Sequence, residues 1–338
     1  MKTATPPTPG PHYSPAITSM KRALSAHFSS SGMALENPFC IRDNSNIYHT
    51  RIPAPEPFDA AVKQCLFPQT QSLDPLAAKD QYNALERVHT AFAGLDGRYS
   101  VPTPLHFSPA LAAFAMSWVD GESLSRKLRS PLALIEGQGW LREVGAWMGH
   151  FHTAGPRRSQ RLGADPRHLD AGNYAASAAP ESTFSNAIRV LRQSAPLLKG
   201  LQVEVTWLHG DCKADNFILT GQEVYGIDIS LTDENPVEYD IAMFLNNLDL
   251  LLSGPQHIHL RAMQAKFESA FLQGYGPCGP PVSQAYLDWT RLNFLLFQWH
   301  TMQSGQRPRL NAWVLNRMYA SSTAHLCRKV DRDLHPWS

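Results

Sequence analysis

The sequence predicts an α+β fold in two lobes: a small N-lobe built on an antiparallel sheet plus a helix, and a larger, mostly helical C-lobe that holds one hairpin. Two observations support this prediction. Short strand-like runs follow one another over residues 38–67, whereas long segments with helical periodicity dominate after Gly121. A chain of 338 residues is also long enough to bury two cores of medium size. We therefore expect the N-lobe over residues 36–119 and the C-lobe over residues 120–338.

Residues 1–35 are rich in Pro, Ser, Thr and Ala. Such a stretch buries little apolar surface, so we predict that it is a disordered tail. The alternative is a short helix over residues 16–28 that docks on the body of the protein.

In the N-lobe, three short strands are predicted, joined by tight polar connections into an antiparallel meander. They cover "PFCIR" (38–42), "NIYHTRI" (46–52) and "FDAAVKQCLF" (58–67). Residues 74–92 then repeat apolar side chains at helical spacing, with Tyr82, Leu85, Val88 and Phe92 on one stripe. The run "LAAFAMSWV" (111–119) predicts a further buried strand that ends at the hinge between the lobes.

Helices dominate the C-lobe. The helical patterns cover residues 139–154, 236–252 and 282–302. The first of them includes His150 and His152, which we expect to be structural histidines. A strand is predicted at residues 203–208.

Composition and charge exclude several classes of function. Only 17% of the residues are charged and the net charge is +1, so neither nucleic acid nor an anionic membrane surface is an expected partner. No apolar run approaches the roughly 20 residues that span a bilayer. The five cysteines are odd in number and dispersed, which indicates reduced thiols and a cytoplasmic location. No pattern indicates an oligomeric state.

The stretch "WLHGDCKADNFIL" (207–219) places polar and charged side chains between two strand-like runs. It leads into a predicted hairpin with Gly221 in its turn. A two-residue turn pairs Asn216 with Ile227, and a three-residue turn pairs it with Asp228. In either register "DCKADN" and "IDIS" meet at the open end of the hairpin.

That end of the hairpin gathers Asp211, Asp215, Asn216 and Asp228 in a small volume. Like charges so close repel each other unless a cation lies among them, and carboxylate and amide oxygens are the ligands that Mg²⁺ prefers. The sequence therefore predicts a divalent metal site. The alternative is that each of these residues only serves a turn.

The segments "HGDCKADN" and "GIDIS" resemble the catalytic and metal-binding motifs of the aminoglycoside phosphotransferase and choline kinase group, which has a protein-kinase-like fold. The resemblance covers about residues 37 to 300. It implies phosphoryl transfer from ATP to a hydroxyl group, with Asp211 as the base and with Asn216 and Asp228 on Mg²⁺. It also implies that His209 stabilises the loop and that Lys213 contacts the γ-phosphate or is solvated.

Upstream segments extend the resemblance into the N-lobe. The pair Ser45-Asn46 resembles the nucleotide loop of the family, and Lys63 in "AAVKQC" resembles the lysine that binds the nucleotide phosphates. "AMSWVDGESL" resembles the hinge segment, which implies adenine contacts near Ser117 and Val119.

Two further segments resemble parts of the family that hold the catalytic loop and the phosphate-binding lysine in place. "NPVEYDIAMFL" implies that Asp240 braces the catalytic loop. In the family a helix after the third strand carries a Glu that pairs with the lysine, whereas here Gln81 falls at that position. Asp80 and Glu86 are the alternatives as partners of Lys63.

The acceptor is expected to be a small molecule of the aminoglycoside, sugar or amino-alcohol type. Only eleven residues separate Asp228 from Asp240, which is too few for the activation segment of a protein kinase. A protein kinase is therefore the third hypothesis for the function. The second is a pseudokinase, a nucleotide-binding or scaffolding module, supported by Gln81 alone. The helix with Trp289 and Arg291, and further along Phe297, Trp299 and His300, forms either an acceptor pocket or part of the core.

Overall fold

The structure, a computed structural model, describes Arg22, Ala26, Ala34–Leu35 and residues 40–42, 44–52, 57–95, 97–163, 182–221, 223–230, 232–304 and 309–334. These residues form two compact units. One unit contains the described residues up to Thr90 together with Pro102–Val119, and the other contains Ala91–Val101 and the described residues from Asp120 onward. Most of the predicted tail, and of the alternative helix within it, lies outside the described residues.

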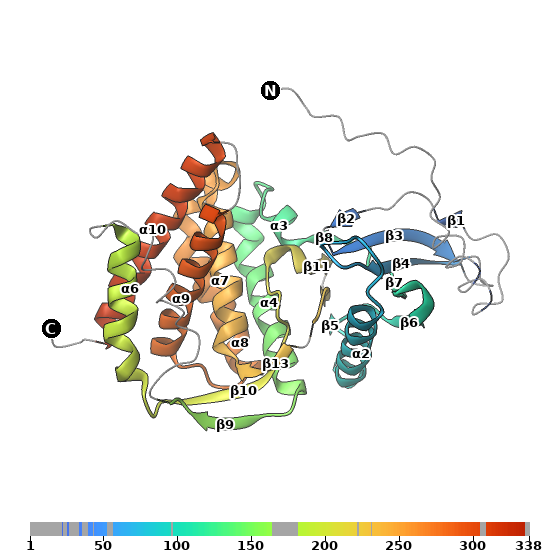
Figure 1. Cartoon of the computed structure of the whole chain (residues 1–338), viewed down its shortest axis with the longest axis horizontal. Coiled ribbons are helices and arrows are strands. Elements are labelled where there is room, and N and C mark those ends of the chain that lie inside the picture. The colour runs from blue at the N-terminus through green and yellow to red at the C-terminus, as the bar shows by residue number, and fades with distance from the viewer. Residues whose placement is uncertain are drawn as a thin grey trace. The chain divides into compact units, whose positions relative to one another are not determined.

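The first unit is built on a six-stranded antiparallel sheet in the order β1-β3-β4-β7-β6, with β2 also paired to β3 (Figure 1). Its strands are β1 (Ala34–Leu35), β2 (Cys40–Arg42), β3 (Ser45–Ile52), β4 (Phe58–Cys65), β6 (Pro104–Ser108) and β7 (Ala113–Ser117), with the short η1 (Pro109–Leu111) between the last two. The predicted meander is confirmed, because β2, β3 and β4 pair in chain order. The sheet begins with Ala34, two residues before the predicted start of the lobe.

Strand β4 lies in the middle of this sheet, between β3 and β7. Its register pairs Lys63 with Ile47 on one side and with Phe114 on the other. The last six residues of β4 are buried. One face of the sheet contributes a compact apolar cluster that includes Ile52 and Val62, which is the core of this unit.

Helix α2 (Pro75–Phe92) follows β4. It begins where an Asp74 carboxylate oxygen accepts a hydrogen bond from the Ala77 backbone nitrogen at 3.0 Å, which satisfies a helix N–H group that has no partner within the helix. The predicted apolar stripe is confirmed, because its last three members are buried: Leu85, Val88 and Phe92.

Residues 91–101, assigned to the N-lobe from the sequence, belong to the second unit. Phe92 lies edge-on to Trp147, with 5.4 Å between ring centroids, and Trp147 Nε1 donates to the Ser100 carbonyl oxygen at 2.7 Å. Strand β5 (Tyr99–Ser100) pairs in parallel with β12 (Glu223–Gly226). Local pattern did not indicate this, because β5 has only two residues and its partner strand is far away in the sequence.

The second unit is mostly helical. Its helices are α3 (Leu124–Lys127), α4 (Ala133–Ala154), α6 (Thr183–Ser194), α7 (Glu238–Ser253), α8 (Gln264–Cys278), α9 (Gln284–Ser304) and α10 (Arg309–Leu334), with the short η2 (Ala195–Leu198), η3 (Ala214–Asn216) and η4 (Pro255–Met263). Helix α4 packs along α8, and α6, α9 and α10 pack together (Figure 1). Their shared core includes Leu191, Trp289 and Trp299.

Two small sheets accompany these helices. The order β13-β10-β9 joins β13 (Thr232–Pro236), β10 (Gln202–Leu208) and β9 (Arg158–Arg161), and the order β5-β12-β11-β8 adds β11 (Phe217–Thr220) and β8 (Glu122–Ser123). They carry the hairpin and the strand before it, so they position the polar segment that the sequence singles out.

The hairpin of β11 and β12 has the two-residue turn. Thr220 pairs with Glu223, and the backbone nitrogen of Ile227 donates to the Asn216 carbonyl oxygen at 2.9 Å. Gly221 has φ +59° in the turn, a conformation that suits glycine. Gly226 is required for packing, because a Cβ there would lie 2.1 Å from the Trp147 ring. Of the two registers predicted, the structure therefore has the one that pairs Asn216 with Ile227.

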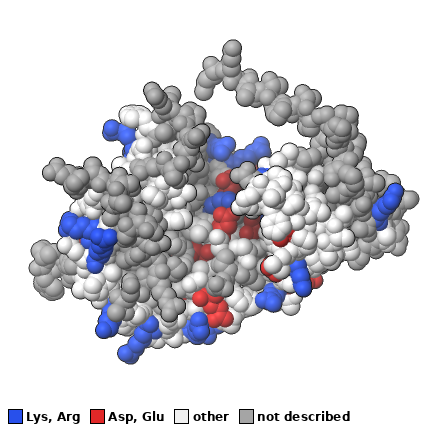
Figure 2. Space-filling view, viewed as in Figure 1, with Lys and Arg blue, Asp and Glu red and all other residues white. Residues whose placement is uncertain are grey.

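The surface carries mixed charge. On the face shown in Figure 2, the described Lys and Arg side chains lie in small separate groups rather than in one continuous basic surface. Across the described ranges of the chain, no helix combines the length and the apolar character needed to cross a membrane.

Candidate active site

The segment from His209 to Asn216 connects β10 to β11, and a carboxylate on α7 holds its first residues. Asp240 Oδ2 accepts a hydrogen bond from the His209 backbone nitrogen at 2.6 Å, and Asp240 Oδ1 accepts one from the Gly210 nitrogen at 3.1 Å. Asp240 is buried, so these charge-assisted bonds fix where the loop begins. The predicted bracing role of Asp240 is confirmed.

A histidine on α4 completes this support. His152 Nε2 lies 3.1 Å from Asp240 Oδ2, and His152 Nδ1 lies 3.0 Å from the Tyr275 hydroxyl of α8. Burial acts to raise the pKa of the Asp240 carboxyl, but the bonds from His152 and from the loop outweigh it, and the pKa falls below its usual value. His152 is therefore a structural histidine, as predicted, and it joins α4, α7 and α8 at the loop.

The Asp211 carboxylate receives two donors on one oxygen. Lys213 Nζ lies 2.5 Å from Asp211 Oδ2, and Asn216 Nδ2 donates to the same oxygen at 3.0 Å. The Asp211 side chain is 44% exposed, and no described residue donates a hydrogen bond to its Oδ1. One oxygen is thus fixed by the protein, and the other is open to a bound molecule.

The Asn216 side chain has an acceptor that the described residues leave without a hydrogen bond. Its Nδ2 is used by Asp211, whereas Oδ1 is buried and has no donor. Such a group costs about 1–3 kcal/mol if nothing binds it. Asp228 lies one residue beyond Ile227, the pairing partner of Asn216, and has φ +62°, a conformation that is uncommon outside glycine and concentrates at functional sites.

These two groups fit a divalent cation. Mg²⁺ takes oxygen ligands and usually completes its shell with water and phosphate oxygens. Within the described ranges, no group of three or more His, Cys, Asp or Glu side chains could hold a metal ion. A metal at this place would therefore depend on the amide oxygen of Asn216, on Asp228, and on ligands from a bound nucleotide.

His209 is buried among aromatic rings rather than exposed at the site. Its ring centroid lies 6.1 Å from those of Trp147, Phe151 and Phe217. Burial lowers the pKa of His209, although the carboxylates of Asp240, Asp211 and Asp228 oppose this. A neutral, enclosed imidazole suits loop support, the role that the resemblance implies for it.

Asp215 does not join the other acidic groups. Its side chain is exposed and accepts a hydrogen bond from Ser125 Oγ of α3. The reason is local, since residues 214–216 form the tight turn η3 and neighbouring side chains there point in different directions. The neighbouring Ala214 nitrogen donates to Asn247 Oδ1 of α7 at 2.9 Å, a second anchor of the loop that the sequence did not reveal.

The residues expected to bind the nucleotide lie in the first unit. Lys63 lies on the central strand β4, as the resemblance implies, and it is buried. Gln81 lies on α2 and is half-buried. The pairing of Lys63 with Gln81, Asp80 or Glu86 stays a prediction.

The segment expected as a nucleotide loop is the start of a strand. Ser45 pairs with Arg42 and Asn46 with Ile41, so the pair opens β3 directly after the turn from β2. Ser117 ends β7, and its hydroxyl accepts a hydrogen bond from the Thr103 nitrogen at 2.8 Å. Val119 follows β7 and is the last residue of the first unit.

Helix α9 was expected to form either an acceptor pocket or part of the core, and its residues fall into both groups. Trp289, Arg291 and Trp299 are buried, so they belong to the core. Phe297 is 55% exposed and lines a groove with α7 and α10. The groove has a volume of about 330 Å³ and is lined by Asn247, Leu250, Phe297, Gln298, Thr301, Met302 and Tyr319.

This groove adjoins the segment from His209 to Asn216, because its residue Asn247 accepts a hydrogen bond from the Ala214 nitrogen. None of its described lining residues is charged. The side-chain oxygen of Gln298 is buried and has no hydrogen bond from the described residues.

The chain matches a known family. The model of the phosphotransferase enzyme family matches residues 71–295, which is more than half of the chain and includes the segment from His209 to Asn216 and the hairpin. A search of curated proteins found no match.

Solved structures with a similar fold include three kinases. An amicoumacin kinase in complex with AMP-PNP, Ca²⁺ and Ami has a TM-score of 0.57 and 13% identity, over 95% of this chain and 94% of that one. A glucosamine kinase in complex with glucosamine, ADP and inorganic phosphate has a TM-score of 0.54 and 13% identity, over 90% and 82%. A choline/ethanolamine kinase family protein from Mesorhizobium loti has a TM-score of 0.55 and 13% identity, over 94% and 95%. These likenesses bear out the predicted protein-kinase-like fold.

Proposed function

The chain belongs to the phosphotransferase enzyme family and is a phosphotransferase with a hydroxyl acceptor, and we propose that this acceptor is a small molecule that receives the γ-phosphate of ATP. One observation carries the proposal. The Asp211 carboxylate is fixed through Oδ2 by Lys213 and Asn216 and leaves Oδ1 for an acceptor hydroxyl.

In this proposal Asp211 accepts or orients the proton of the acceptor hydroxyl. Lys213 keeps the carboxylate in place and adds positive charge where charge develops during transfer. Asn216 Oδ1 and Asp228 would hold Mg²⁺, which would supply positive charge next to the phosphates. The buried, unpartnered oxygen of Asn216 supports this assignment. Lys63 binds the nucleotide phosphates, as the resemblance implies.

The acceptor lies in the groove between α7 and α9 in this proposal. The groove is anchored to the catalytic loop through Asn247 and presents the exposed ring of Phe297 together with the unpartnered oxygen of Gln298. A lining without charged side chains suits a neutral, hydroxyl-bearing molecule with an apolar face better than a polycation. A sugar-type acceptor fits this lining best among the three expected classes.

The test is ATP consumption by the full chain across four sets of acceptors: sugars, amino alcohols, aminoglycosides and nucleosides. We expect turnover with a sugar-type acceptor and expect Phe297→Ala to raise KM for it by about tenfold with a smaller change in kcat, through lost stacking. Arg317→Ala, a change of an exposed residue of α10 outside the groove, is the control. Turnover with a polycation alone would contradict the neutral acceptor, and ATP binding without turnover on any acceptor would favour the pseudokinase.

A further inference from the structure

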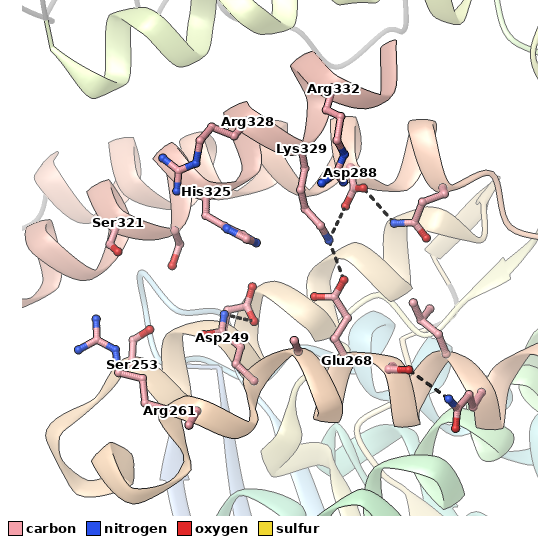
Figure 3. A pocket seen from close by; sticks show the side chains of 18 residues that line it. Asp249, Ser253, Arg261, Glu268, Asp288, Ser321, His325, Arg328, Lys329 and Arg332 are labelled. Carbon is pink, nitrogen blue, oxygen red and sulfur yellow. Dashed lines mark hydrogen bonds and ion pairs between the residues drawn. The ribbon is translucent and has the colours of Figure 1, made fainter. Parts of the chain in front are cut away.

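A cavity of about 880 Å³ lies among α7, α8, α9, α10 and η4, and no step of the proposed reaction uses it (Figure 3). It lies on the other side of α7 from the catalytic loop. Asn247 binds the loop, whereas Asp249, about 200° further round the same helix, lines the cavity. The volume is within the roughly 300–1,000 Å³ that small-molecule sites occupy.

One wall of the cavity carries three carboxylates, and each of them already pairs with a basic side chain of the protein. Arg291 is buried, with Nη2 2.6 Å from Asp249 Oδ2 and Nη1 2.9 Å from Glu268 Oε2. Lys329 Nζ lies 2.9 Å from Glu268 Oε1 and 3.4 Å from Asp288 Oδ1. Burial acts to raise the pKa of Glu268, but Arg291 and Lys329 lower it to about 2. Two cations thus share the three carboxylates of this wall, and none of the three is without a basic partner.

Basic side chains also line the cavity, together with neutral residues. Figure 3 shows His325, Arg328 and Arg332 along the α10 side, and Arg261 on the opposite side. Neither the Arg261 nor the Arg328 guanidinium has an ion pair or hydrogen bond with another residue of the described ranges. Burial and the nearby charge of Lys329 lower the pKa of His325.

The net charge of the side chains around the cavity is positive. Four basic side chains line the cavity against three acidic ones, and Arg291 lies behind the acidic wall as a further positive charge. A guanidinium group binds the oxygens of phosphate in a bidentate manner. Two such groups on opposite walls require oxygens that point in several directions, which a tetrahedral phosphate offers and a planar carboxylate does not.

We propose that this cavity is a second ligand site, which binds a small molecule bearing a phosphate group between Arg261 and Arg328. The serine hydroxyls of Ser253 and Ser321, which also line the cavity, are donors available to the same ligand. The site is separate from the phosphotransfer site and does not depend on the acceptor proposed above.

The test is thermal unfolding of the full chain without nucleotide or Mg²⁺, with glucose 6-phosphate, inorganic phosphate, citrate or NaCl at matched ionic strength. We expect the two phosphate compounds to raise Tm by a few degrees over NaCl at concentrations well above Kd, because they bind the folded state. The comparison of the two phosphate compounds tells whether an organic phosphate or inorganic phosphate is held more tightly.

The double variant Arg261→Gln/Arg328→Gln is expected to weaken phosphate binding by about tenfold or more, because two charge-assisted hydrogen bonds are lost. Both residues are exposed at the rim, and the Tm in NaCl checks that the variant folds. The control is Arg317→Gln, at an exposed arginine that lies on α10 with Arg328 but outside the cavity. It should bind the phosphate compounds as the unchanged chain does. The single variants Arg261→Gln and Arg328→Gln are each expected to lose part of the phosphate binding, which tests each arginine separately. An equal shift with citrate, no shift beyond NaCl, or a shift that survives in the double variant would each overturn the proposal.

Discussion

Asp240 Oδ2 lies 2.6 Å from the backbone nitrogen of His209, so a carboxylate on helix α7 holds the first residue of the loop from His209 to Asn216. His152 approaches the same oxygen from α4. The loop is therefore positioned by two helices of the second unit rather than by its own sequence, and its geometry depends on how those helices pack.

Replacing Asp240 by Ala should lower the free energy of unfolding by about 3 kcal/mol. Three donors, on the buried His152 and His209 and the half-buried Gly210, would lose their acceptor, and each unsatisfied group costs on the order of 1 kcal/mol. Urea unfolding measures this loss, and Asp331→Ala, at an exposed acid of α10, is the control. A loss no larger than that of the control would show that Asp240 does not support the loop.

Replacing Asp211 by Asn should reduce kcat by roughly two to four orders of magnitude if the carboxylate acts as a general base. ATP binding should be nearly unchanged, because the partner of Asp211 is the acceptor rather than the phosphates. Steady-state rates and nucleotide titration separate the two effects. Asp215→Asn is the matched control, since Asp215 is exposed and bonded to Ser125. Turnover close to that of the unchanged chain would assign the base to another residue.

Replacing Asp228 by Ala should abolish the part of the ATP-dependent rise in Tm that requires Mg²⁺. The reason is that Asp228 supplies the charged ligand beside the Asn216 amide oxygen in the proposed metal site. Thermal unfolding with ATP, with and without Mg²⁺, measures the effect. Glu223→Ala, at an exposed position on the same hairpin, should retain the full shift. If the Asp228 variant retains it as well, the metal assignment is wrong.

Glu238 should make stability depend on pH. Its Oε1 accepts a hydrogen bond from the Ser283 nitrogen at 3.0 Å, and burial raises its pKa from the usual 4.5 to about 7. Between these values the unfolded chain loses a proton that the folded chain keeps, so this contribution to stability is complete below about 4.5 and is lost as pH rises to about 7. The loss is at most on the order of 3 kcal/mol.

The Glu238→Gln variant should lack this decline, because a neutral amide can keep the bond from Ser283 and does not titrate. Urea unfolding at several pH values between about 4.5 and 7 measures it. Glu136→Gln, at an exposed position on α4, should leave the decline unchanged. A decline of the same size in the Glu238 variant would place its origin elsewhere.

Part of the order of the elements could be predicted from the sequence, because these elements show a clear local pattern. Alternation and apolar runs indicated β3 and β4, helical spacing indicated α2, α4, α7 and α9, and the glycine at position 221 indicated the hairpin. The same local reasoning placed Asp211, Asn216 and Asp228 at one end of that hairpin. The role of Asp240 in holding the loop was implied by the family resemblance and not by local pattern.

The tertiary structure decided what depends on residues far apart in the chain. Packing on Trp147 and the pairing of β5 with β12 assigned residues 91–101 to the second unit. Only the turn geometry selected the register that pairs Asn216 with Ile227. His152 and Asn247 support the catalytic loop from different helices, and Arg291 is buried among carboxylates from three helices. A sequence pattern reports periodicity over one element, whereas burial and ion pairing are set by which faces of separate elements meet.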